Sequence, residues 1–521
     1  MPTIQIDAAI DEQATRVAAE NEAWPSEPIS ALDAARRFIA PNAWFLAAIS
    51  AALLIPIFWH RHLVENDFSS HVYNAWLATL VKKGQAPGVF IVRQWNNVLV
   101  DQMLTFCGSL FGWSAGERIV QCASVLIFFW GAFALIAAAS RRAAWFLLPA
   151  VAMIAYGWTF EIGFSNYYLS LGLGCWAVAL LWRGVGRELW LGLLLLPLIM
   201  LAHAFGFVFA VGAVAYLRIR ERLPRYWKTL PLLAAAALIW LARSYLVRHY
   251  PVHLATALPV TLMNGLNGVD QIVLGGRYRN LARALFLFGV IFFGIDCVER
   301  LFKSRSRKSL SIFAVPAELY AISLFAIALL PDGVKLPEYT AWVGFLLMRF
   351  SSIAALFSLC LLGCLKPQKW HLAAFGAVAL VFFVFLYQDT GILSGMQEQA
   401  DNLVAQLPPG ERVTATVEAL PDSRFYFITR IADRACVERC FSYDDYEPAT
   451  RQFRLRAMPG SPVVSDSLRD VEFMESGVYV VPSELLPMNE IYQCSRDRIT
   501  LCMRPLRAGE LNGPMPEQHL P

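Results

Sequence analysis

The sequence predicts an all-α polytopic membrane protein with a small mixed α/β domain at its C-terminal end. Of its 521 residues, 57% are hydrophobic and only 16% are charged, and the mean hydropathy is +0.48. A soluble globular chain has about 25% charged residues. Apolar runs of roughly 17–25 residues, long enough to cross a bilayer, recur between arginine and lysine clusters. Only the tail after Gln388 has the composition of a soluble domain.

Nine of the apolar runs predict single membrane spans, and the longer segment 188–217 predicts two more. If 188–217 crossed only once, the basic clusters on its two sides would face opposite sides of the membrane. A hairpin bent near His203 and Gly206 places every cluster on the cytoplasmic side, as the positive-inside rule expects. We therefore expect about eleven membrane helices, with the N-terminus inside and the C-terminus outside. The nine single spans are 42–59, 118–138, 143–160, 165–182, 229–246, 281–299, 310–330, 343–364 and 372–388.

This topology divides the chain into three parts. Residues 1–41 are acidic and lack the apolar core of a signal peptide, so we expect a disordered cytoplasmic tail that ends in a short helix around Ala31–Ile39. Residues 42–388 form the transmembrane domain, which includes a large first external loop at 60–117. Residues 389–521 form an extracytoplasmic soluble domain.

The first loop contains two amphipathic stretches and, before them, a pair of acids. Val72–Val81 and Trp95–Phe111 show apolar residues at helical spacing, and both are expected to lie in the membrane interface. Glu65 and Asp67 follow the first span directly, with His71 one turn further on. Such a carboxylate pair could bind a divalent cation or act as general base toward a hydroxyl. It could also mark the membrane boundary or cap the next helix, and His71 could be an ordinary polar anchor.

The C-terminal tail contains three strand candidates, Arg412–Ala419, Phe425–Thr429 and Gly477–Val481. Four cysteines in a small domain outside the cytoplasm favour two disulfides, and a metal site or free thiols are the alternatives. The sequence does not give their connectivity. These cysteines are Cys436, Cys440, Cys494 and Cys502.

The short N-terminal tail, the single span and the loop with an acidic Glu-x-Asp motif resemble the GT-C superfamily of membrane glycosyltransferases. Members of that family transfer sugars from polyprenyl-phosphate donors, and an acid in the first external loop is their usual catalytic residue. The resemblance implies that Asp67 is this catalytic acid and that Glu65 is the preceding acid of the pair. It also implies a bacterial protein of the cytoplasmic (inner) membrane with a periplasmic C-terminal domain.

Besides His71, seven further residues are candidates for substrate binding. Glu161 is either a second acid at the site or a solvated loop charge, whereas Asn166 and Tyr167 could bind sugar hydroxyls or simply lie at the interface. His203 lies in an apolar segment, where it is either functional or bonded to backbone groups at the bend. Arginines near span ends could bind a lipid phosphate, or could snorkel to the surface or belong to ordinary loops. These arginines are Arg277, Arg279 and Arg349.

The sequence thus predicts an inverting glycosyltransferase that acts on an extracytoplasmic glycan, lipid or protein. Asp67 would deprotonate or orient the acceptor, whereas the participation of Mg²⁺ or Mn²⁺, the sugar and the oligomeric state stay open. No P-loop, Rossmann fingerprint, HExxH or GxSxG motif is present, which argues against a nucleotide cofactor. The net charge of +4 is explained by membrane-flanking residues, so no nucleic-acid partner is expected. The alternatives are a non-catalytic scaffold, a degenerate GT-C relative or, less favoured, a lipid or solute transporter.

Overall fold

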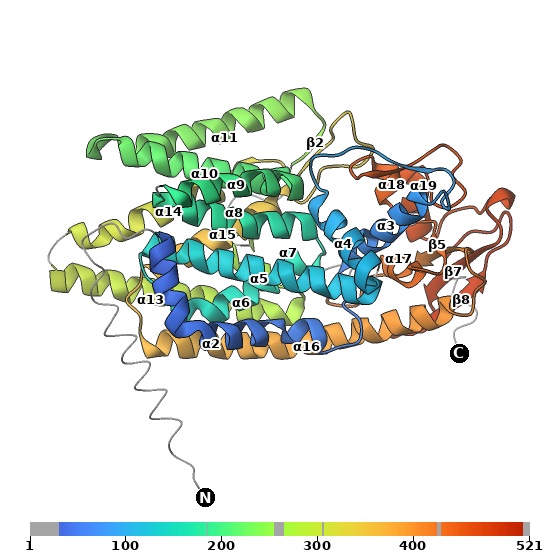
Figure 1. The fold of residues 1–521 in the computed structure, drawn as a ribbon, viewed down its shortest axis with the longest axis horizontal. Helices are drawn as coiled ribbons and strands as arrows, with labels where there is room; N and C mark the ends of the chain where they lie inside the picture. The colour runs from blue at the N-terminus through green and yellow to red at the C-terminus, as the bar shows by residue number, and fades with distance from the viewer. Residues whose placement is uncertain (1–30, 185, 255–264, 305–306, 425–428, 514–521) are drawn as a thin grey trace, which may run out of the picture.

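Seven helices in the described parts of the chain are long and apolar enough to cross a membrane. The computed structural model describes residues 31–184, 186–254, 265–304, 307–424 and 429–513. Most of the seven run along the long axis of the molecule in Figure 1, and each overlaps a predicted span. They are α2 (Ala31–Phe58), α5 (Trp113–Ser140), α11 (Leu230–His249), α13 (Arg279–Ser304), α14 (Ala314–Leu329), α15 (Leu346–Gly363) and α16 (Lys369–Val404).

The count of eleven spans is not confirmed, and the segment 143–160 shows one reason. It is divided into α6 (Leu148–Ala155) and α7 (Trp158–Glu161), with Gly157 between them. At about 1.5 Å per residue, α6 is about 12 Å long, less than half of a hydrocarbon core of about 30 Å. Both helices are largely buried, so this segment fills the interior of the helix bundle. The predicted tail lies mostly outside the described residues, although α2 does begin at Ala31.

The apolar segment 188–217 forms two helices, as predicted, and the break falls at His203. α9 (Arg187–Ala202) ends there and α10 (Ala204–Arg222) begins, because the backbone of His203 is extended. Its Nδ1 atom accepts a hydrogen bond from the Phe205 amide at 3.1 Å, which caps α10. α8 (Ser165–Arg183) packs against both helices and against α5. His203 therefore has the structural role at the bend that one reading of the sequence gave it.

The two predicted helices of the first loop exist, but only one has the predicted surroundings. α4 (Leu99–Phe111) exposes Phe106, Leu110 and Phe111, as expected of a helix at an interface. α3 (Asn66–Lys82) is buried over most of its length. The C-terminal domain lies against it, with α17 and α18 near α3 in Figure 1. An interfacial position for α3 is therefore wrong, because a second layer of protein covers it.

The C-terminal domain is built on a four-stranded sheet. Three strands are parallel in the order β5-β4-β7, and β8 pairs antiparallel with β7. The predicted strand at 412–419 is confirmed as β4, which is rich in the β-branched residues that favour strands. The elements are β4 (Arg412–Thr416), α17 (Ile431–Cys436), β5 (Phe441–Ser442), α18 (Glu447–Thr450), α19 (Leu468–Glu475), β7 (Met488–Gln493) and β8 (Leu501–Pro505).

The other strand predictions for this domain fare differently. Gly477–Val481 is not a strand, because only Val480 forms an isolated bridge, to Leu511. Of Phe425–Thr429, residues 425–428 lie outside the described residues. Two disulfides are present, as predicted. Each joins cysteines close in sequence, Cys436 to Cys440 and Cys494 to Cys502.

Two features join the C-terminal domain to the membrane helices. α16 continues past the expected boundary at Gln388 as far as Val404, and it packs against α17 and β8. β1 (Val89–Ile91) of the first loop pairs antiparallel with β6 (Leu455–Ala457). A second small sheet, of β2 (Val252–His253) and β3 (Gly333–Val334), joins two other loops. A continuous helix and a shared sheet thus hold the tail domain over α3.

Candidate active site at helix α3

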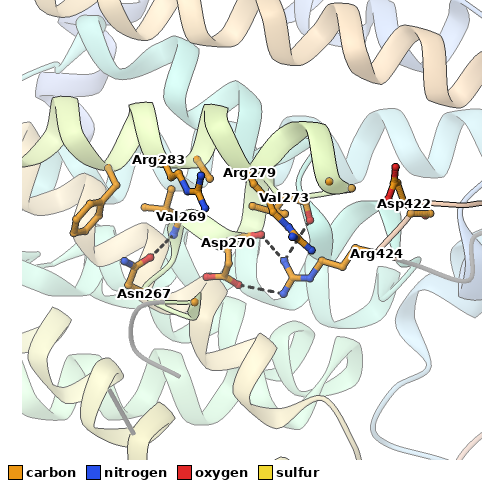
Figure 2. A pocket seen from close by; sticks show the side chains of 14 residues that line it. Asn267, Val269, Asp270, Val273, Arg279, Arg283, Asp422 and Arg424 are labelled. Carbon is orange, nitrogen blue, oxygen red and sulfur yellow. Dashed lines mark hydrogen bonds and ion pairs between the residues drawn. The ribbon is translucent and has the colours of Figure 1, made fainter. Parts of the chain in front are cut away.

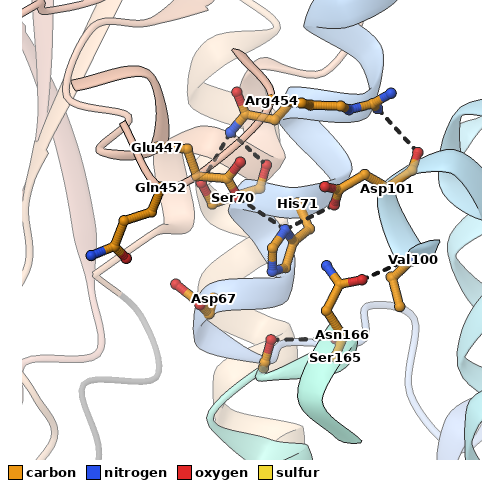
Figure 3. Close-up of polar contacts among 12 residues, drawn as sticks. Asp67, Ser70, His71, Val100, Asp101, Ser165, Asn166, Glu447, Gln452 and Arg454 are labelled. Carbon is orange, nitrogen blue, oxygen red and sulfur yellow. Dashed lines mark hydrogen bonds and ion pairs between the residues drawn. The ribbon is translucent and has the colours of Figure 1, made fainter. Parts of the chain in front are cut away.

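One side of α3 carries four polar side chains at helical spacing. Asp67, Ser70, His71 and Asn74 occupy positions i, i+3, i+4 and i+7, which lie on one face of a helix. The last three are buried, whereas Asp67 is half-buried. Buried polar groups require hydrogen-bonding or charged partners. Figure 3 shows that these partners come from α4 and from the C-terminal domain.

His71 lies between two buried carboxylates. Its Nδ1 atom is 3.0 Å from Oδ1 of Asp101 on α4 and 2.9 Å from Oε1 of Glu447 at the start of α18. Burial lowers the pKa of His71, but the charges of Glu447 and Asp101 outweigh it and raise this pKa well above its usual value. The ring is therefore an imidazolium that ties the first loop to the C-terminal domain. A polar anchor at the membrane surface does not fit a side chain so fully enclosed.

The segment Ser442–Glu447 supplies the other partners of α3. Ser70 Oγ donates to Oδ1 of Asp445 at 2.6 Å, and the hydroxyl of Tyr73 accepts from the Ser442 amide at 3.0 Å. Burial and the charge of Glu447 raise the pKa of Asp445 to about 7. Burial also raises the pKa of Glu447 to about 7.

Sequence reasoning missed the acids of this segment. They lie in the tail, far along the chain from α3, and nothing local indicates that the two regions meet. The available signal was the run Asp444-Asp445-Tyr446-Glu447, which is unusually acidic for a stretch next to a disulfide. Its burial became evident only from the fold.

Asp67 is the one acid of this face that remains partly open. It lies in the first turn of α3, where its amide donates to the Ile162 carbonyl at 3.1 Å. Its Oδ1 atom accepts a hydrogen bond from the Tyr446 hydroxyl. Burial and the charge of Asp67 hold the pKa of Tyr446 well above its usual value, so the phenol keeps its proton. One carboxylate oxygen is thus fixed, and Oδ2 accepts no hydrogen bond within the described parts of the chain.

Glu65 has different surroundings from Asp67. Nε2 of Gln121 on α5 donates to its Oε2, and the residue is only 1% exposed. Burial, with the nearby carboxylates of Glu161 and Glu117, raises the pKa of Glu65 well above its usual value. Glu65 is thus enclosed and bonded to Gln121, and it is not positioned as a second base. Glu161 is 4% exposed, which excludes its reading as a solvated loop charge.

The two acids of the pair do not fit a divalent cation. Their carboxylates have separate partners on different elements, as described above. Across the described residues, no group of three or more His, Cys, Asp or Glu side chains is placed to hold a metal ion. We therefore assign no step to Mg²⁺ or Mn²⁺.

Arg349, near the start of α15, lies in the same region as Asp67. Its guanidinium is 4.9 Å from the ring centre of Phe164 and 5.7 Å from that of Tyr167, and it lies within electrostatic range of Asp67. Nη1 donates to the Gly344 carbonyl at 3.1 Å. Nε is buried and has no hydrogen-bond partner among the described residues. An acid and an incompletely bonded arginine thus meet at one site.

Three other predicted residues surround this arginine or α3. Asn166 accepts from the Val100 amide at 2.9 Å, while its Nδ2 is buried and unbonded within the described residues. The Tyr167 hydroxyl donates to the Arg349 carbonyl at 2.8 Å. The ring of His203 lies 5.5 Å from that of Tyr167 and within electrostatic range of Arg349. Arg349 Nε and Asn166 Nδ2 are thus two buried donors that have no hydrogen-bond partner among the described residues.

The two arginines predicted near α13 have different surroundings. Arg277 pairs with Asp389 of α16 at 2.6 Å and donates to Gln388 at 2.8 Å, so its charge is compensated within the protein. Arg279, two residues on, lines a separate cavity.

Comparison with family models, with curated proteins and with solved structures finds no match to this chain.

Proposed function

We propose that this protein is a membrane glycosyltransferase that moves a sugar from a polyprenyl-phosphate donor to an acceptor outside the cytoplasm. The observation that carries the proposal is that Asp67 lies within electrostatic range of Arg349. Among the described residues, Oδ2 of Asp67 accepts no hydrogen bond and the buried Nε of Arg349 has no partner. A carboxylate that can take a proton and a guanidinium that can bind a phosphate are the two groups that direct displacement at a sugar phosphate requires.

In this mechanism Oδ2 of Asp67 accepts the proton of the acceptor hydroxyl as its oxygen attacks C1 of the sugar. The bond between C1 and the phosphate oxygen breaks, and the lipid phosphate leaves with the bonding electron pair. Arg349 stabilises the negative charge that develops on this leaving group. The hydrogen bond from Tyr446 fixes the Asp67 carboxylate, and Asn166 Nδ2 can donate to a sugar hydroxyl. Direct attack inverts the configuration at C1, and no covalent intermediate is needed.

The test compares cell-envelope glycans in cells that express wild type, Asp67→Asn or Arg349→Gln at matched membrane levels. General base catalysis contributes about 10²–10⁴-fold, so both variants should lose the glycan that the wild type produces. Glu398→Gln is the matched control, because that acid is exposed on α16 and pairs only with Arg61 in the described structure. Unchanged glycans in Asp67→Asn would favour the scaffold interpretation over the enzyme.

Tyr446→Phe refines the same test. It removes only the donor that fixes the Asp67 carboxylate and keeps the aromatic ring. Loss of one hydrogen bond to a charged group weakens an interaction by about 1.5–3 kcal/mol, so we expect partial loss of product, about tenfold or more. Wild-type product levels in this variant would contradict the role given to Tyr446.

A further inference from the structure

A separate cavity of about 710 Å³ lies beside the first turns of α13 (Figure 2). None of the residues of the α3 site lines it. Three of its lining residues are arginines, Arg279 and Arg283 from α13 and Arg424 from the segment before the C-terminal domain helices. Its volume lies within the range of about 300–1,000 Å³ that small-molecule sites occupy. We propose that this cavity binds the phosphate group of a membrane lipid.

The two arginines of α13 are the first part of the argument. Arg279 and Arg283 are one helical turn apart, so they share a face of α13, and both are exposed. Arg283 donates to Asn280 at 3.3 Å, and within the described parts of the chain no carboxylate pairs with either arginine. Like charges at this spacing destabilise a helix. An anion bound between them removes that repulsion.

Arg424 adds a third positive charge in a fixed position. Its Nη1 donates to the Asp270 carbonyl at 2.8 Å, and its Nη2 lies 3.8 Å from Oδ2 of Asp270. The carboxylate of Asp270 is shared with Ser351, whose Oγ donates to Oδ1 at 2.5 Å. Arg279 lies within electrostatic range of Arg424. Among the described lining residues the acids are Asp270 and Asp422, so three cations face two anions there.

The other walls of the cavity indicate that the phosphate belongs to a lipid. Ala282 and Phe286 of α13 line it next to Arg283, and Phe286 is 47% exposed. The same helix continues with exposed Leu287 and Val290, on the apolar surface expected to face the membrane. A phosphate among the arginines would therefore have its acyl or prenyl chain beside an apolar helix. Arginine is well suited to phosphate, because its planar fork can bind two oxygens at once.

The experiment measures equilibrium binding of farnesyl phosphate to the purified full-length protein in neutral detergent. Every protein tested also carries Arg349→Gln, so the donor site proposed above cannot account for the binding. The assignment of the α13 cavity does not depend on that proposed function. Arg279→Gln/Arg283→Gln should weaken binding about tenfold or more, because each lost charged contact is worth about tenfold. Arg248→Gln, an exposed arginine in the last turn of α11, is the matched control and should bind normally.

Four probes identify the source of the phosphate. Farnesyl phosphate and dihexanoyl phosphatidylglycerol carry a lipid phosphate, inorganic phosphate carries no chain, and farnesol carries no charge. Tighter binding of a lipid phosphate than of the other two supports the proposal. If inorganic phosphate binds as tightly as farnesyl phosphate, the lipid assignment is overturned. If farnesol binds as tightly, the role given to the arginines is overturned. Equal affinity of the Arg279→Gln/Arg283→Gln variant and its parent would overturn the site itself, and Arg424→Gln offers an independent check outside α13.

Discussion

Helices α3 and α4 begin from the same kind of amphipathic pattern in one loop, yet they end in opposite environments. α4 keeps Phe106 and Leu110 exposed at 66% and 60%, whereas α3 buries nearly everything, including His71. The difference arises on the polar side of α3, where acids from the C-terminal domain cover it. An amphipathic pattern therefore predicts that one face is buried, but complementary charge elsewhere in the chain can bury the other face as well.

The largest effect on this difference is expected from His71→Ala. The change leaves the carboxylates of Asp101 and Glu447 buried without their shared cation. Breaking a buried ion pair in this way costs about 3–5 kcal/mol, which chemical unfolding of the purified protein in detergent would measure. Ser109→Ala, an exposed polar site on α4, is the control and should be nearly silent. Equal stability of the two variants would mean that the ion pairs do not hold α3 in place.

The next effect concerns the close approach at the start of α3. Gly163 has a φ of +82°, and an added Cβ would lie 2.3 Å from the Phe68 amide nitrogen. Gly112, between α4 and α5, has a φ of +83° but open space around it. Both alanine variants carry backbone strain from a positive φ, of about 1–3 kcal/mol, and only Gly163→Ala adds a clash with α3. Thermal unfolding should rank Gly163→Ala below Gly112→Ala; the reverse order would contradict the packing of α3 on this turn.

A smaller effect is expected from pH. His71, with a raised pKa, stabilises the folded state below its unfolded pKa of about 6.5, and this contribution is lost as pH rises through the folded value. Asp445 and Glu447 bind protons up to about pH 7 in the folded state, so their contribution also falls as pH rises. Other charged groups also face this cluster. They include Asp67, Asp101, Asp433, Asp444, Glu475 and Arg430.

Hydrogen exchange, corrected for its intrinsic pH dependence, checks this expectation. Protection of α3 amides should decrease between about pH 5 and pH 8, whereas that of α4, which carries only Asp101 of this cluster, should decrease less. Asp445→Asn should reduce the slope for α3. A slope of the opposite sign in the wild type would show that the buried acids are not protonated in the folded state.

The smallest effect is expected from Phe106→Ser on α4. This side chain is exposed, so the free energy of unfolding in detergent should change by less than about 0.5 kcal/mol. Phe68→Ser on α3 is the matched substitution at a side chain that is 2% exposed, and it should cost several times more. Similar losses in both variants would indicate that another part of the protein covers α4.

The sequence predicted what depends on local pattern and missed what depends on docking. Apolar length identified the long helices, and charge parity identified the break at His203, because both follow from the properties of the bilayer. The 143–160 span is not confirmed, because Gly157 divides it, and apolar composition alone cannot distinguish a buried short helix from a crossing one. The prediction of two disulfides is confirmed, and the structure supplies the connectivity that the sequence left open.

The same division holds for the candidate site. Asp67 and Arg349 were chosen from their positions at span ends, and the fold brings them into one region. Tyr446, which bonds to Asp67, and the His71 partners Asp101 and Glu447 were missed, because nothing in the sequence indicates that their segments meet on α3. Glu65 and Asp67 were adjacent in sequence and so were paired by prediction, yet they point to different partners.

Two contacts of the first loop can form only late in synthesis. β1 pairs with β6, and α3 pairs with the Ser442–Glu447 segment, and both partners lie in the tail. A ribosome that adds about 5–20 residues per second would complete α3 roughly 20–75 s before it reaches Glu447. During that interval the polar face of α3, which carries Asp67, Ser70 and His71, has none of its partners from the tail. A nascent chain released before the tail is made would contain Asp67 and Arg349. It would lack Tyr446, which bonds to Asp67, and Glu447, which pairs with His71. The proposed transfer activity therefore requires the complete chain.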